Sequence, residues 1–226
     1  MNYKEIRSYL NCERAIFPSE CEEGFPQLAP CHLDLDNPVM IGFNHALSEK
    51  EPQEKVCHFF IDDYQFERVW KYPSRYIAPL TRFKAVIAPD FSTYTNFPKV
   101  LQQFNHYRNL WIAKYLQTNG VTIIPQISFS DESSYDWVFH GQPVGSMFCL
   151  STVGCFLEKE TRALYIKGIE RAIKALKPSS LLIYGKLHDE LAEALKKDDF
   201  DGKIAIGKPQ NFANLEKNSK RKKKAP

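Results

Sequence analysis

Short apolar runs recur along the chain, and polar or turn-forming residues follow each of them. Within a run the residues are apolar at consecutive positions and do not alternate with polar ones. Continuous runs of this kind indicate strands that are buried on both faces, which is typical of parallel sheets. Seven strands are predicted, over residues 39–44, 57–62, 84–90, 121–126, 146–151, 181–185 and 203–207.

Helical patterns occupy the stretches between the predicted strands. The clearest extends from Pro98, which suits a first helical turn, to Thr118, and Gly120 follows it. Further helices are predicted over residues 159–176 and 187–197, with shorter ones over 3–10, 65–71 and 132–139. A strand and a helix alternating about every 25 to 35 residues indicate right-handed βαβ crossovers.

Repeated βα units of this kind can form two α/β folds. We predict a compact or incomplete (β/α) barrel, because the chain order gives each strand a following helix and no Gly-rich fingerprint turn follows a strand. The alternative is an open, doubly wound parallel sheet. The α/β domain is expected over residues 39–207. An irregular segment over 1–38 is expected to pack on it, and a basic tail over 208–226 is expected to be disordered.

The composition is that of an ordinary globular chain. It has 226 residues, of which 43% are hydrophobic and 25% charged, which is not the composition of a disordered or membrane chain. No run of about 18 apolar residues occurs, so no membrane-spanning helix is expected. The polar N-terminus lacks the pattern of a signal peptide. We therefore expect a cytoplasmic protein without a membrane partner.

The positive charge of the chain is concentrated in its tail. The net charge is +3, and the last ten residues carry six Lys or Arg side chains and no acidic one, which leaves −3 for the rest. A flexible cationic arm adds salt-sensitive attraction to nucleic acid of any sequence. The tail therefore makes a nucleotide or nucleic acid a candidate partner, and a merely solubilising tail is the alternative. The basic run is Lys220, Arg221, Lys222, Lys223 and Lys224.

Six cysteines are present, but the chain is not a small secreted one of the kind that disulfides stabilise. Cys12, Cys21 and Cys31, with His32 nearby, do not have the spacing of a zinc finger or ribbon. Cys155 follows a predicted strand without a paired histidine, and we expect it to be a structural thiol.

Several strings carry a resemblance to a known family. They are FIDDYQFERVW over residues 60–70, PDFSTY over 89–94, YRN over 107–109, NGVTIIP over 119–125 and STVGC over 151–155. With these strings the chain resembles the phage- and mobile-element-associated group known as domain of unknown function 4417, roughly over residues 38–207. The resemblance implies a gene context of phages, plasmids or integrated elements in bacteria, and it implies no established activity.

Polar side chains follow the predicted strands, where parallel α/β folds place their sites. Carboxylates that meet there could exchange protons with a substrate or bind a divalent cation. The alternative for each is an N-cap, in which its oxygen accepts a backbone N–H of the next helix. The candidate catalytic carboxylates are Asp62, Asp63, Asp90 and Asp131.

Other polar residues near the strand ends are candidates for substrate binding. Ser151, Thr152 and Gly154 could form a turn that holds a phosphate, although a plain turn is the alternative. Arg108 lies within a predicted helix, where pairing with a carboxylate is the alternative to binding an anion. The full set is Ser92, Tyr94, Arg108, Gln126, Ser151, Thr152, Gly154 and Lys186.

Two functions fit these patterns. The first is an enzyme that acts on a nucleotide, a nucleic acid or another phosphate-bearing substrate at the carboxyl ends of the strands. The second is a non-catalytic accessory protein that binds nucleic acid through the tail or binds a host protein. The sequence identifies no cofactor, although a divalent cation would suit the carboxylates.

Overall fold

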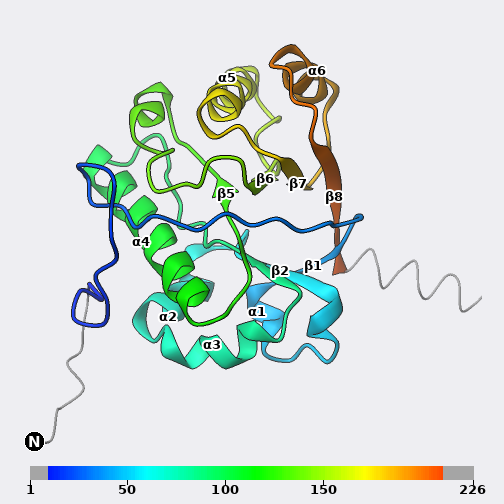
Figure 1. Ribbon diagram of the computed structural model, residues 1–226. Helices are drawn as coiled ribbons and strands as arrows, with labels where there is room; N and C mark the ends of the chain where they lie inside the picture. Colours follow the sequence, from blue (N-terminus) through cyan, green and yellow to red (C-terminus); the bar gives the residue numbers. More distant parts are fainter. Residues whose placement is uncertain (1–9, 211–226) are drawn as a thin grey trace, which may run out of the picture.

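The computed structural model describes residues 10–210 (Figure 1). The predicted short helix over residues 3–10 and the basic run Lys220–Lys224 lie outside this part of the chain, apart from Leu10. Among the described residues no helix is long and apolar enough to cross a membrane.

The described strands form one sheet in which every pairing is parallel. Their order across the sheet is β4-β3-β2-β1-β8-β7-β6-β5. The bounds are β1 Val39–Gly42, β2 Lys55–His58, β3 Ala85–Ile87, β4 Ile123–Ile124, β5 Gln126–Ile127, β6 Met147–Ser151, β7 Ser180–Tyr184 and β8 Lys203–Pro209.

The two ends of this sheet meet at Pro125, the single residue between β4 and β5. On one side, Ala88 N donates to Ile124 O over 2.9 Å, and on the other Cys149 N donates to Pro125 O over 2.8 Å. One extended segment therefore joins β3 to β6 and nearly closes the sheet into a barrel. The predicted barrel is confirmed, and the open sheet is not the fold. The predicted strand is divided at Pro125, because proline has no N–H to donate to a ladder.

Helices follow the strands around the outside of the barrel (Figure 1). The predicted helix over 132–139 is a short 310 turn instead. The structure adds a helix over residues 74–81, with Pro79 inside it, that the sequence pattern did not predict. The helices are α1 Phe43–Ala46, α2 Asp63–Lys71, α3 Ser74–Thr81, α4 Lys99–Thr118, α5 Lys159–Leu176 and α6 Asp189–Lys197, with 310 turns η1 Pro52–Glu54 and η2 Glu132–Asp136.

Apolar side chains fill the barrel interior and the layer between strands and helices. Along β2, Val56 belongs to the interior cluster and Cys57 to the outer one, as the alternation of a strand requires. The interior is tightly packed on β8, where a Cβ on Gly207 would overlap the sulfur of Met40. The strands are therefore buried on both faces, which explains why their sequences read as continuous apolar runs.

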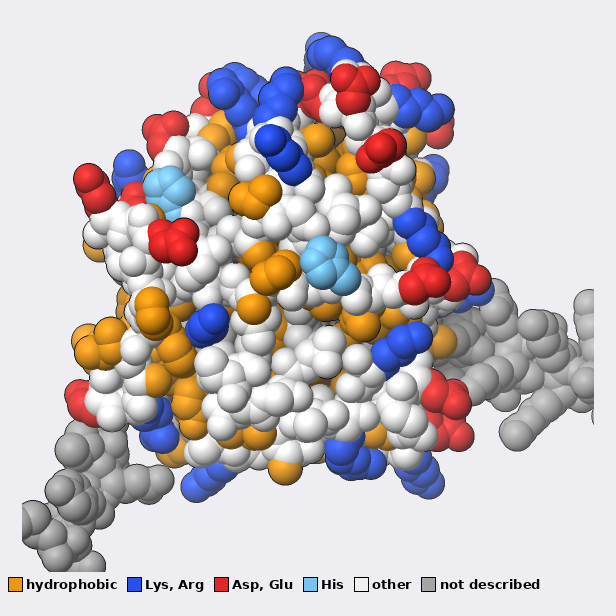
Figure 2. Space-filling model, in the orientation of Figure 1, with side chains coloured by type: hydrophobic (Ala, Val, Ile, Leu, Met, Phe, Trp, Pro, Cys, Tyr) orange, Lys and Arg blue, Asp and Glu red, His pale blue; other side chains and the backbone are white. Residues whose placement is uncertain are grey.

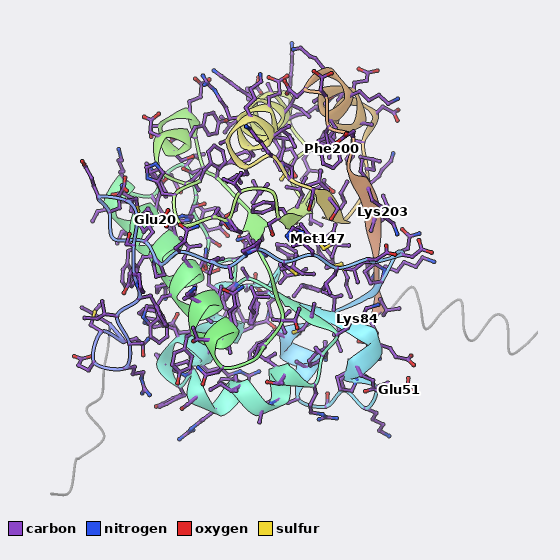
Figure 3. The ribbon with its side chains drawn as sticks, in the orientation of Figure 1. Glu20, Glu51, Lys84, Met147, Phe200 and Lys203 are labelled. Atoms are coloured by element: carbon purple, nitrogen blue, oxygen red, sulfur yellow. The ribbon has the colours of Figure 1, made fainter. Side chains whose placement is uncertain are left out.

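The N-terminal segment crosses the end of the barrel at which the strands begin (Figure 1). Cys31 N donates to Ser146 Oγ over 2.9 Å, and Met147 N donates to Cys31 O over 2.8 Å. The side chains of Cys31 and Leu35 are buried among those of the barrel interior. Figure 3 places Met147 beneath this crossing segment, near the middle of the barrel.

The crossing segment closes this end of the barrel to solvent. Figure 2 shows the covered face, on which charged side chains gather mostly toward the rim. Lys203, at the start of β8, pairs with Asp34 of the segment over 2.6 Å. The segment does not cross the opposite end, at which the strands finish, and we call that end the open end of the barrel.

Replacing Leu35 by alanine tests whether this segment is part of the core. Leu35 is 1% exposed, so Leu35→Ala is expected to lower the free energy of unfolding by about 2–5 kcal/mol, measured by urea denaturation. Leu47→Ala is the matched control, because Leu47 is 51% exposed and its loss should change stability by no more than about 0.5 kcal/mol. Equal effects of the two substitutions would contradict a buried role for the segment.

Candidate functional site

An aromatic layer lies toward the open end of the barrel. His58 ends β2 and Tyr184 ends β7, and their ring centroids are 4.4 Å apart. Phe60 stacks on Tyr184 at 5.1 Å. His58 is 4% exposed, and burial lowers the pKa of its imidazole to about 4, so the ring is neutral at pH 7. None of these three rings is among the candidate site residues predicted from the sequence. Whether such a side chain points into the barrel depends on strand register, which the sequence does not show.

A small pocket of about 160 Å³ with both polar and apolar lining residues lies beside the ends of β5 and β6. Of the predicted residues, Asp90, Gln126 and Ser151 line it together, which places three different strand ends in one cavity. The remaining lining residues are Ile127, Ser128, Phe129, Val153, Cys155 and Tyr165.

Asp90 is the carboxylate of this pocket. Its Oδ1 accepts a hydrogen bond from Gln126 Nε2 over 2.9 Å, and the same amide nitrogen donates to Pro89 O over 3.1 Å. Burial raises the pKa of Asp90 to about 6, and the nearby charge of Asp63 raises it further, while hydrogen bonds from Gln126 and Ser128 lower it. A carboxyl group that titrates near neutral pH can both accept and release a proton under physiological conditions.

The opposite wall of the pocket is formed by the loop after β6 and by α5. Tyr165 Oη donates to Ser151 O over 2.9 Å, and Cys155 Sγ lies 3.7 Å from the same carbonyl. Burial and the charge of Asp90 raise the pKa of Cys155 to about 11, so it remains a thiol and is not a nucleophile at neutral pH. The Ser151 hydroxyl makes no hydrogen bond with the described residues, which leaves it available to a ligand.

Two predicted residues, Asp63 and Ser92, bind each other beside the pocket. The Asp63 carboxylate accepts hydrogen bonds from Ser92 N and Ser92 Oγ over 3.1 and 3.0 Å. Asn105 Nδ2 donates to Ser92 O over 2.6 Å, so α4 holds the same loop from the other side. This set of contacts, which we call the loop clip, fixes the segment that carries Asp90.

Arg108 completes the loop clip from α4. It donates to Glu67 Oε2 over 2.9 Å and to Asn105 Oδ1 over 2.7 Å. Its guanidinium lies 3.6 Å from the centroid of the Phe91 ring. Arg108 thus pairs with a carboxylate and covers an aromatic ring, as the alternative interpretation of its sequence context predicted, and it does not line the pocket.

The other predicted carboxylates lie outside the pocket. Asp131 caps η2, because its Oδ1 accepts hydrogen bonds from Ser133 N and Oγ over 2.9 and 2.7 Å. Asp62 is exposed and accepts a hydrogen bond from Gln65 Nε2 over 3.3 Å. Tyr94 is also exposed, and it packs edge-on against Phe97. The four carboxylates therefore do not converge on one position in the described residues.

A second pocket, of about 220 Å³, lies beyond the loop after β6. Lys186 is exposed and lines it, and among the described residues it makes no ion pair. Thr152 is buried and donates to Lys186 O over 3.0 Å, so its hydroxyl is occupied, while Gly154 supplies a turn with φ +80°. The other lining residues are Phe156, Arg162, His188, Asp189 and Glu190.

The fold defines an α/β barrel protein, with two pockets beside the loops that follow its strands. Over residues 17–201 the chain matches the domain of unknown function 4417, and it belongs to this family. The matched region includes the segment that covers the other end of the barrel, which the resemblance over residues 38–207 had left out.

Two phage proteins are among the curated relatives. The chain is 37% identical over 132 residues to the Gene 1 protein of Mycobacterium phage L5, covering 58% of each chain. It is 29% identical over 174 residues to the Gene 1 protein of Mycobacterium phage D29, covering 77% of this chain and 64% of the relative. The matched part is thus less than two thirds of each relative. These matches confirm the resemblance to a phage-associated family, and no solved structure matches the chain.

The raised pKa of Asp90 predicts a pH-dependent cost in stability. Below about pH 4 its carboxyl is protonated in the folded and unfolded chain alike. Between about pH 4 and pH 6 only the unfolded chain ionises it, so the native state is disfavoured as the pH rises. Above about pH 6 the cost is constant.

Asp90→Asn removes this cost and keeps an oxygen for the Gln126 hydrogen bond. The variant is expected to gain about 1–3 kcal/mol over the natural chain between pH 4 and pH 7, measured by urea denaturation at each pH. Asp62→Asn, at an exposed position, should show no such gain. A difference that does not change with pH would contradict the raised pKa.

Proposed function

We propose that this protein is an enzyme that acts on a phosphate-bearing substrate at the open end of the barrel, with Asp90 as the group that exchanges a proton. The observation that carries the proposal is the half-buried carboxyl of Asp90, whose pKa is raised to about 6, in the same pocket as the Ser151 hydroxyl, which has no hydrogen-bond partner among the described residues. Burying a carboxylate without a counter-charge costs stability, and such costs are concentrated at functional sites.

The residues around Asp90 suit general acid–base chemistry. Gln126 holds one carboxylate oxygen at 2.9 Å, so the carboxyl is oriented before the substrate arrives. In its ionised form Asp90 accepts a proton from a substrate hydroxyl or from water, and in its protonated form it donates one to a leaving oxygen. The Ser151 hydroxyl donates a hydrogen bond to the substrate beside it.

The neighbouring pocket is lined by two cations, Lys186 and Arg162, and by two anions, Asp189 and Glu190, and Lys186 is the cation that a phosphate would meet. Lys186 brings an exposed ammonium group without an ion pair among the described residues, and Arg162 lies beside it in a pair with Glu190 at 2.9 Å. Only the loop after β6 separates the two pockets, since Cys155 lines one and Phe156 the other. Their combined volume lies within the range of ligand sites, about 300–1,000 Å³. A nucleotide is the substrate class that best fits a reacting group at Asp90 and a phosphate at Lys186.

The chain's charge pattern supports a second candidate function. The basic run Lys220–Lys224 would give an accessory protein salt-sensitive affinity for nucleic acid without any role for the pocket. The acidic balance of the remaining chain makes the tail the only strongly basic part of the sequence.

Binding of ATP and of inorganic phosphate, measured separately by calorimetry, tests the first proposal. Lys186→Ala and Ser151→Ala are each expected to weaken ATP binding by about tenfold, which corresponds to the loss of one charge-assisted or neutral hydrogen bond. Lys71→Ala is the matched control, because Lys71 is equally exposed at the end of α2 and should leave binding unchanged.

Two results would contradict the proposal. The first is equal binding by all three variants, and the second is the absence of any ATP or phosphate binding to the natural chain. If, in addition, a short DNA duplex binds the natural chain and loses all affinity when residues 217–226 are removed, the accessory function replaces the enzymatic one.

A further inference from the structure

Three side chains with metal-binding atoms meet on the surface, and none of them lines the Asp90 pocket or the Lys186 pocket. They are Cys21, Glu23 and His140, and their ligand atoms all lie within 4.8 Å of one another. Cys21 and Glu23 come from the turn of the N-terminal segment that Glu20 marks in Figure 3. His140 comes from the turn after η2, 117 positions from Glu23.

The chemistry of this cluster is that of a zinc site. A thiolate, an imidazole nitrogen and a carboxylate oxygen are the three ligand types that Zn²⁺ takes in proteins, at bond lengths of about 2.0–2.3 Å. Tetrahedral geometry at these lengths places ligand atoms about 3.3–3.8 Å apart. His140 Nδ1 already lies 3.0 Å from Glu23 Oε2, so a small rotation of the side chains would admit the ion.

The two turns are fixed by contacts that do not involve these ligand atoms. On the first turn, Gly24 N donates to Cys21 O over 3.1 Å. On the second, His106 Nε2 lies 3.3 Å from His140 O, and Gly141 O accepts a hydrogen bond from Leu28 N over 2.9 Å. The donor atoms are therefore brought together by the fold itself, which reduces the cost of binding an ion.

The packing of Gly141 holds the turns against each other. A Cβ at this position would lie 2.7 Å from Pro26 O and 2.7 Å from a methyl carbon of Leu110, so only glycine allows this approach. The φ of +76° at Gly141 also favours glycine. The second turn therefore meets the N-terminal segment in van der Waals contact, directly beside the three donors.

We propose that Cys21, Glu23 and His140 bind a Zn²⁺ ion, with water as the fourth ligand. Binding displaces the thiol proton of Cys21 to solvent and replaces the direct contact between His140 and Glu23. The ion joins the N-terminal segment to the turn after η2 through side chains that do not line the Asp90 pocket. Cys12 and Cys31 take no part, because Cys12 lies outside the cluster and Cys31 is buried among the side chains of the barrel interior.

Cobalt(II) titration of the full-length protein, freed of any histidine tag, tests this assignment. One equivalent of Co²⁺ is expected to produce a sulfur-to-cobalt charge-transfer band, and Zn²⁺ should then abolish it by displacement. Cys21→Ser is expected to remove the band, and His140→Ala to weaken binding by at least about tenfold. Cys12→Ser is the control for the loss of a surface thiol and should behave as the natural chain does.

Thermal unfolding supplies a second measurement that does not depend on the cobalt absorption band. Zn²⁺ should raise the Tm of the natural chain and of Cys12→Ser, and leave that of Cys21→Ser unchanged. Circular dichroism of each variant without metal establishes that it is folded. The proposal is overturned if folded Cys21→Ser keeps the cobalt band, if Cys12→Ser loses it, or if the natural chain binds no cobalt.

Discussion

The structure depends on one segment, residues 121–127, pairing with a strand on each of its sides. Its carbonyls accept hydrogen bonds from the N–H of Ala88, directly after β3, and from Cys149 N on β6, and these two contacts join the ends of a sheet that would otherwise stay open. Because every pairing is parallel, nearly closing the sheet collects all strand ends into one ring. Asp90, Gln126 and Ser151 share a pocket for this reason, although the chain separates the first from the last by 61 positions.

The two ends of the barrel have different roles. At the end where the strands begin, Cys31 and Leu35 enter the core, and buried apolar packing stabilises the fold. At the other end, the Asp90 carboxylate accepts a hydrogen bond from Gln126, and the Ser151 hydroxyl has no partner among the described residues. The loop clip of Asp63, Ser92, Asn105 and Arg108 holds the loop between β3 and α4 beside them. The strings that carry the family resemblance thus include residues that position the site as well as residues that line it.

Sequence pattern predicted the parallel strands well because burial on both faces leaves a direct signature in continuous apolar runs, and the helix after each strand favoured the barrel over the open sheet. It could not show that the predicted strand over residues 121–126 pairs with β3 before Pro125 and with β6 after it. For the site, position after a strand placed Asp90, Gln126 and Ser151 correctly near one another. The same criterion also selected Asp63 and Ser92, which bind each other and do not line the pocket. Which way a strand-end side chain points depends on register and on the next helix. Tyr165 in α5 and the Cys21–His140 pair had no local signal, since their proximity arises only from the fold.

The central claim is that the fold holds the carboxyl of Asp90 in a pocket that disfavours its charge, at the one open end of the barrel. The most direct measurement is a pH titration of the Asp90 carboxyl carbon by NMR, assigned by comparison with Asp90→Asn. The account predicts a midpoint at about pH 6, against 3.8 for an unperturbed aspartate. A midpoint near the unperturbed value would mean that the carboxyl is solvated and ordinary, and would contradict the assignment of this pocket as the functional site.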